Sequence, residues 1–221
     1  MLSEESEVIE GHVISENKYM TNVVLFTIMW SVGIYDTYMM LMLNKYLEGS
    51  IYVNFYMEGL AGIVGSAVAD YSYTRLRIKN SFIFAHLLTL AGAILICAFE
   101  GGLFSPNFVT TYGFCPKSPY PPESIETTNY YLANLIPYIG FFTKIGINVQ
   151  VQNAYQGSFS NATVFPVQRR STAIGICNLV ARGCTIFAPI VAEWEKPWPA
   201  INLCTVTTFA LVASLAFPSK E

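Results

Sequence analysis

Residues 80–99, with the sequence NSFIFAHLLTLAGAILICAF, decide the fold class of this chain. The stretch is apolar on every face of a helix and has about the 20 residues that a transmembrane helix requires. A transmembrane β-strand would instead show segments of about 10 residues with alternating polarity. The pattern therefore predicts an α-helix that crosses a membrane.

Similar stretches occupy most of the 221 residues. The chain is 53% hydrophobic and only 12% charged, which is more apolar than a soluble domain needs. We expect an all-α membrane protein with an acidic tail over residues 1–20, a bundle of six transmembrane helices over 21–217 and a short tail over 218–221. The predicted spans cover residues 21–43, 51–69, 80–99, 129–152, 172–193 and 199–217.

Charge and motif content exclude several protein classes. A net charge of −3 without a basic stripe argues against a nucleic-acid partner. No Ser/His/Asp set, Gly-rich phosphate loop, pair of catalytic carboxylates or metal-ligand spacing is present, so we expect no enzyme, cofactor or metal site. The cysteines lack CxxC spacing, and those in the spans are expected to be packing residues. They are Cys97, Cys177, Cys184 and Cys204 in the spans and Cys115 in a loop.

Each of two segments outside the spans allows two interpretations. The first twenty residues contain five glutamates and no arginine, unlike a signal or transit peptide. They form either a solvated tail or a docking arm. The loop over residues 100–128 contains five prolines and is too polar and broken to enter lipid. It is either a mobile surface loop or a partner-binding one.

Basic residues predict the orientation in the membrane. They gather in the loops after the second and fourth spans and beside both termini, whereas the opposite loops hold three lysines. By the positive-inside rule, both termini face the cytoplasm or an equivalent such as the mitochondrial matrix. The inner group is Lys18, Arg75, Arg77, Lys79, Arg169, Arg170 and Lys220, and the outer group is Lys45, Lys117 and Lys196. The sequon at Asn161 falls on the inner side and is discounted.

Two blocks of sequence resemble a known family. Residues 35–55, YDTYMMLMLNKYLEGSIYVNF, and 163–191, TVFPVQRRSTAIGICNLVARGCTIFAPIV, resemble the carboxy-terminal six helices of the organic ion transporters of the major facilitator superfamily. Such transporters join two six-helix bundles, each made of inverted three-helix repeats, and bind substrate between them. The resemblance therefore implies half of a transporter fold.

Departures from the family pattern argue against an autonomous transport cycle. The inner-loop motif keeps its acid and some bases, at Asp70, Arg75, Arg77 and Arg170, but it loses a glycine and the tight turn that glycine would allow. Thr163 and Gly62 stand where the family often has acidic residues.

Ionisable residues inside the spans are candidates for a functional site, because each costs a few kcal/mol to insert. Depth along the helices predicts that Asp36 pairs with Arg182 or Lys144. By resemblance, Arg182 would bind an organic anion; a structural ion pair is the alternative. His86 is expected to be a packing residue. The five in-span residues are Asp36, Glu58, His86, Lys144 and Arg182.

A polar stripe follows the fourth span, because Lys144, Asn148 and Gln152 recur every four residues and Gln156 continues them. Polar groups facing lipid are costly, so the stripe should face a cavity or another protein. Two ridges of small residues are expected to allow close helix packing within the bundle. They are Ala61, Gly65 and Ala69, and Ala173, Cys177 and Ala181.

Two functions fit these patterns. The favoured one is a structural or accessory subunit of a larger membrane complex, whose other subunits cover the stripe; a respiratory complex of the mitochondrial inner membrane is one candidate host. The alternative is an organic anion or zwitterion transporter that works as a homodimer or as half of a split pair. Its cavity would be lined by Asp36, Lys144, Gln152 and Arg182.

Overall fold

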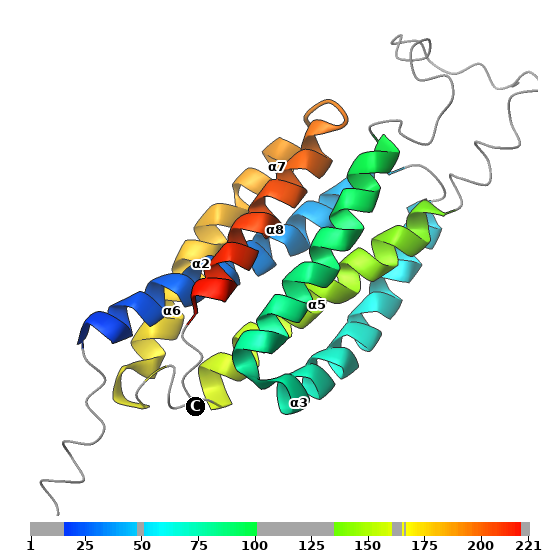
Figure 1. Ribbon diagram of the computed structural model, residues 1–221. Coiled ribbons are helices and arrows are strands. Elements are labelled where there is room, and N and C mark those ends of the chain that lie inside the picture. Colours follow the sequence, from blue (N-terminus) through cyan, green and yellow to red (C-terminus); the bar gives the residue numbers. More distant parts are fainter. Residues whose placement is uncertain (1–15, 48–50, 101–134, 161–164, 166, 218–221) are drawn as a thin grey trace, which may run out of the picture.

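The computed structural model describes residues 16–47, 51–100, 135–160, 165 and 167–217, and these residues are helical apart from short turns. The helices lie side by side in one elongated bundle (Figure 1). They are α2 (Glu16–Leu43), α3 (Ile51–Glu100), α5 (Ile136–Ser160), a 3-10 helix η1 (Val167–Arg169), α6 (Arg170–Thr185), α7 (Phe187–Ala192) and α8 (Trp198–Ala216).

Four helical segments are long and apolar enough to cross a membrane, so the chain is a multi-span helical membrane protein. The expected number of six spans is not reached on this criterion. One reason is that α3 is a single helical element of 50 residues. The other is that α5 is too polar to qualify. The four segments are Tyr19–Leu43, Ile51–Glu100, Arg170–Ala192 and Trp198–Ala216.

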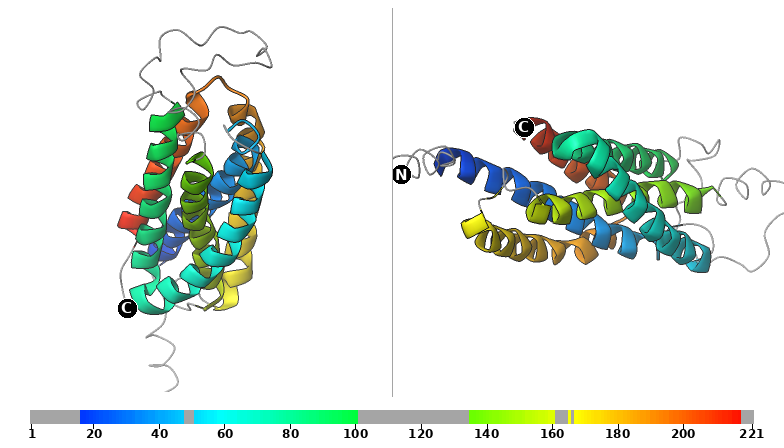
Figure 2. Two further views of the ribbon diagram at one scale, coloured as in Figure 1. Left: turned by 90° about the vertical axis from the view of Figure 1, so that its right-hand side faces the viewer. Right: turned by 90° about the horizontal axis from the view of Figure 1, so that it is seen from below.

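The long helix α3 folds back on itself at Arg77. A straight helix of 50 residues would measure about 75 Å, far more than the hydrocarbon core of about 30 Å. At Arg77 the backbone leaves the helical region, with φ 61° and ψ 156°. Its two arms then run antiparallel (Figure 2), and Ser72 Oγ lies 2.9 Å from Ser81 Oγ across the turn. The expected loop between the second and third spans is thus a tight turn without a glycine.

Helices α2 and α5 form the centre of the bundle. The side of α2 bearing Phe26 and Trp30 is buried among aromatic rings, including Phe82 of α3 and Phe165, which meet Phe26 edge to face. Helix α5 packs along both arms of α3 and also contacts α2. Edge-to-face aromatic pairs add to the free energy gained by burial. The peripheral helices α3, α6, α7 and α8 expose many apolar side chains, as expected of surfaces that face lipid.

Both predicted ridges of small residues pack inside the bundle, as expected. Ala61, Gly65 and Ala69 are buried where α3 meets α5. Ala173, Cys177 and Ala181 are buried where α6 meets α2, and Cys177 Sγ lies 3.2 Å from Thr27 Oγ1.

Some predicted boundaries need correction. Helix α2 begins at Glu16, so the last five residues of the predicted tail are helical. Helix α5 runs eight residues past the predicted end of the fourth span, because its polar stripe packs largely on α3 as far as Gln156. The remaining predictions on Cys115, Asn161, Thr163 and residues 101–128 lie outside the described residues.

The basic residues of the predicted inner loops lie at one end of the bundle. The turn of α3, the beginnings of α2 and α6 and the end of α8 are all at this end (Figure 1). Arg169 stacks over the ring of Tyr19 there, at 5.6 Å from the ring centroid. The side of the membrane that this end faces stays a prediction.

Replacing Arg77 by glycine is expected to raise thermal stability. Non-glycine residues at such positive φ cost of order 1–3 kcal/mol, and glycine removes that strain. The matched control is Arg75→Gly, which places glycine at a helical position and should lower stability by about 1 kcal/mol. The measurement is thermal unfolding of the purified protein in detergent, and a lower unfolding temperature for R77G would contradict the strain argument.

Candidate functional site

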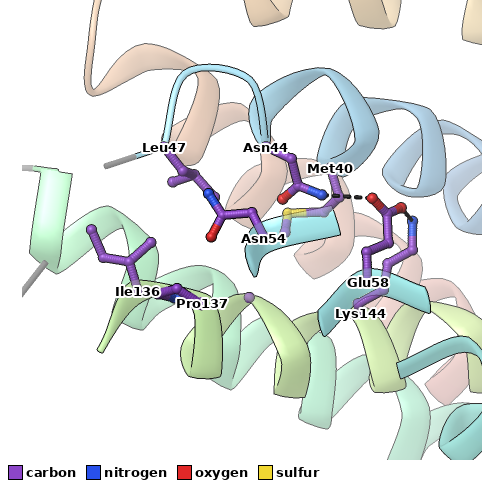
Figure 3. A pocket seen from close by; sticks show the side chains of 9 residues that line it. Met40, Asn44, Leu47, Asn54, Glu58, Ile136, Pro137 and Lys144 are labelled. Carbon is purple, nitrogen blue, oxygen red and sulfur yellow. Dashed lines mark hydrogen bonds and ion pairs between the residues drawn. The ribbon is translucent and has the colours of Figure 1, made fainter. Parts of the chain in front are cut away.

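A cluster of polar side chains joins α2, α3 and α5 near the end of the bundle opposite the α3 turn. Lys144 Nζ of α5 lies 2.5 Å from Glu58 Oε1 of α3, and both side chains are largely buried. Asn44, just after α2, donates from Nδ2 to Glu58 Oε2 at 2.6 Å. Lys144 Nζ also lies 3.4 Å from the Thr37 carbonyl oxygen. The three helices are thereby joined through one buried ion pair (Figure 3).

A small pocket opens beside this ion pair. The pocket has room for about one water molecule, far less space than a small-molecule site requires. One wall is polar and the others are mainly apolar. The lining residues are Met40, Asn44, Leu47, Asn54, Glu58, Ile136, Pro137, Gly140 and Lys144.

The prediction that Asp36 pairs with Arg182 or Lys144 is wrong. Lys144 pairs with Glu58 instead, because α3 packs directly on α5 and brings a closer acid. Asp36 is fully buried, and its Oδ2 lies 3.0 Å from Thr207 Oγ1 of α8. Among the described residues, its Oδ1 has no hydrogen-bond partner. The depth of a residue along its helix does not show which neighbouring helix its side chain faces.

Arg182 is exposed on α6, although it lies in the middle of a candidate span. Its Nη1 donates a hydrogen bond of 2.8 Å to Tyr38 Oη of α2. No carboxylate of the described residues forms an ion pair with it. Unlike Lys144, Arg182 faces outward from the middle of a candidate span with no opposite charge beside it in the described part of the chain.

The polar stripe of α5 packs largely on the first arm of α3. Lys144 reaches Glu58, Asn148 packs on Gly65, and Gln156 donates to Asp70 Oδ1. Half-buried Gln152 lies between the last two along the helix. The chain itself therefore supplies much of the cover that the stripe was expected to need, and a partner-facing role for Asn148 and Gln152 stays a prediction.

The remnants of the inner-loop motif do not form one site with this cluster. Asp70 and Arg75 are exposed near the α3 turn, and Arg170 begins α6 at the same end of the bundle. His86 is buried, as expected for packing: its Nδ1 lies 2.6 Å from the Phe82 carbonyl oxygen, but Nε2 has no partner among the described residues.

Sequence reasoning missed Asn44 and Asn54 as members of the cluster. The sequence did contain one indication of their role. Each is an amide near the end of an apolar segment, at about the same depth in the membrane as Glu58. Neither residue belongs to a periodic pattern, because Asn44 follows α2 and Asn54 lies in the first turn of α3. Only the approach of the three helices brings them together.

Replacing Lys144 by methionine is expected to lower the free energy of unfolding by of order 3 kcal/mol, because Glu58 is left as a buried unpaired charge. The double variant K144M/E58M should recover most of this loss. Exposed Lys45 supplies the control, since K45M removes a cation–π contact worth at most about 1 kcal/mol. Thermal unfolding in detergent measures all three, and additive losses in the double variant would show that the pair is not coupled.

Comparison with known proteins identifies no family for this chain: no family model matches it, and no curated protein matches it. The described residues form a helical protein with four candidate membrane spans, and the resemblance to organic ion transporters stays a prediction.

Proposed function

We propose that this chain is an accessory subunit of a larger membrane assembly and that it docks through the outer face of α6. In this proposal both arms of α3 and the polar helix α5 also cross the bilayer, which gives six crossings and half of a transporter-like bundle. The observation that carries the proposal is the exposed, unneutralised charge of Arg182.

The depth of Arg182 makes contact with lipid unfavourable. At 1.5 Å per residue, it lies about 18 Å along the helix from Arg170 and about 15 Å from Ala192, the two ends of its candidate span. An arginine near the centre of a bilayer costs several kcal/mol unless it is paired or faces water. The hydrogen bond that Arg182 donates to Tyr38 leaves the positive charge uncompensated, so a partner with a carboxylate at this depth would remove the cost.

The surface around Arg182 suits close contact with another helix. Leu179 and Ile186 are exposed on either side of it along the helix. At Gly175 and Gly183, a side chain would meet nothing within 4 Å, so a neighbouring backbone could approach closely there. The apolar window of this span is also only 22% buried within the chain, the lowest value among the four candidate spans. Much of α6 is therefore open to a partner.

Arg182→Leu is expected to release the chain from its assembly, because the variant removes the charge that a partner carboxylate would neutralise. The measurement is native gel electrophoresis of mildly solubilised membranes, followed by mass spectrometry of co-purifying proteins. Arg75→Leu is the control, since it removes an exposed arginine near the α3 turn. The proposal fails if R182L stays in a complex of unchanged size and composition.

The alternative function, transport of an organic anion or zwitterion, is favoured by the same exposed arginine. In a homodimer or split transporter, Arg182 would line a water-filled cavity between two halves and attract the anion. The pocket beside Glu58 gives this reading little support, because it is small and its charges are already paired. A purified dimer of this chain alone that exchanges labelled organic anions in liposomes, with loss in R182L, would establish transport instead.

A further inference from the structure

A second polar side chain lies beside Arg182 on the outer surface. Helices α2 and α6 pack side by side (Figure 1), and Arg182 Nη1 donates a hydrogen bond of 2.8 Å to Tyr38 Oη of α2. The ring of Tyr38 is half-buried against the apolar core, which fixes the position of its hydroxyl group. The hydrogen bond holds the guanidinium group at this level, whereas a free arginine near a helix end extends toward water.

Both residues have hydrogen-bond donors that are not yet used. A phenol oxygen that accepts a hydrogen bond can still donate its own proton, and a guanidinium group has five N–H donors in a planar fork. In the described part of the chain, no acceptor takes the hydroxyl proton of Tyr38, and only Nη1 of Arg182 donates to a side chain. The unused donors of the two residues therefore lie together at one exposed point that carries a positive charge.

A carboxylate matches this arrangement of donors. Its two oxygens accept hydrogen bonds in parallel, and its charge neutralises that of the arginine. An amide or a hydroxyl group would accept the hydrogen bonds but leave the charge uncompensated in the middle of a candidate span. The phosphate of an anionic lipid lies in the head-group region, which is about 15 Å or more from Arg182 along the helix.

A second copy of this chain offers no suitable carboxylate among its described residues. Asp36 is fully buried, and Glu58 is paired with Lys144. The remaining described acids lie toward the ends of the bundle, at Asp70, Glu100, Glu193 and Glu195. A two-fold contact through α6 would also bring two Arg182 charges together. The carboxylate must therefore come from a different polypeptide.

We propose that Arg182 and Tyr38 together form a binding site for a carboxylate on a transmembrane helix of another protein. The carboxylate of an Asp or Glu side chain accepts hydrogen bonds from the guanidinium group and from the Tyr38 hydroxyl group. Gly183 lets the partner helix approach closely, because a side chain there would meet nothing within 4 Å. The inference rests on the proposed function, since it names the chemistry of the partner at the docking face of α6.

Synthetic transmembrane peptides test the ligand class on the purified full chain in phosphatidylcholine vesicles. Three leucine-rich helices of equal length carry Asp, Asn or Lys at the central position, and energy transfer from the labelled chain measures their binding. The Asp peptide should bind saturably and at least tenfold more tightly than the Asn peptide, and the Lys peptide should not bind. Equal binding of the Asp and Asn peptides would overturn the proposal.

Two variants test the site itself. Tyr38→Phe keeps the ring and the arginine but removes the hydroxyl group, so it should weaken binding of the Asp peptide about tenfold. Arg182→Lys keeps the charge but loses the planar fork, and a similar loss is expected. Tyr56→Phe is the matched control, because Tyr56 is exposed and, like Tyr38, lies five residues from the end of its helix. Unchanged binding in Y38F would contradict the assignment.

A charge reversal separates lost recognition from lost folding. Arg182→Asp should bind the Lys peptide and no longer the Asp peptide, which a misfolded variant would not do. Two other results would overturn the assignment to a partner helix. One is energy transfer between two labelled copies of this chain that disappears in R182L, and the other is displacement of the Asp peptide by an equal concentration of benzoate, an organic anion.

The peptide experiment and the native-gel experiment with R182L can fail independently. If R182L stays in its assembly while the Asp peptide binds the wild-type chain and not Y38F, the carboxylate site is supported and the accessory-subunit proposal fails. If R182L leaves its assembly but the Asp and Asn peptides bind equally, the docking face is supported and the carboxylate site fails.

Discussion

The packing of α3 against α5 is the interaction on which the rest of the structure depends. Helix α5 carries a lysine and several amides through the interior of the bundle, where each unsatisfied polar group is costly. The first arm of α3 supplies Glu58 to Lys144, and the second arm supplies Thr89, whose Oγ1 accepts a 2.7 Å hydrogen bond from Gln150. Both arms must therefore pack on α5, which requires α3 to fold back at Arg77.

Close approach of the backbones makes these polar contacts reachable. Gly146 of α5 lies against Thr89, and a Cβ at this glycine would be only 2.5 Å from Thr89 Oγ1. Gly92 of the same arm of α3 fits even more closely against Thr143. Short separation at these glycines brings Gln150 within hydrogen-bond distance of α3. The polar helix α5 is thus stable in the centre of the bundle, whereas it would not be stable if it faced lipid.

The cost of an unpaired polar group inside the bundle also explains why Arg182 and Lys144 have different surroundings. Both were expected to compete for Asp36, yet Lys144 has found an acid on an adjacent helix and Arg182 faces outward with a tyrosine as its partner. Asp36 itself lies in the core beside Thr207. An ion pair inside the chain needs no further cover, whereas an outward charge does. In our proposal, the partner chain therefore contacts the outer face of α6 and not the α5 stripe, where the sequence predicted it.

The amino-acid sequence by itself determined the helical membrane class, the positions of most helices and the buried ridges of small residues. These follow from local composition and from the periodicity of a helix, which any segment carries independently of its neighbours. Only the tertiary structure decided that Glu58 pairs with Lys144, that Asn54 lines a pocket and that Arg182 is exposed. Such facts depend on how each helix is rotated about its axis and which helix lies beside it, and residues as far apart as 58 and 144 become neighbours only when the bundle packs.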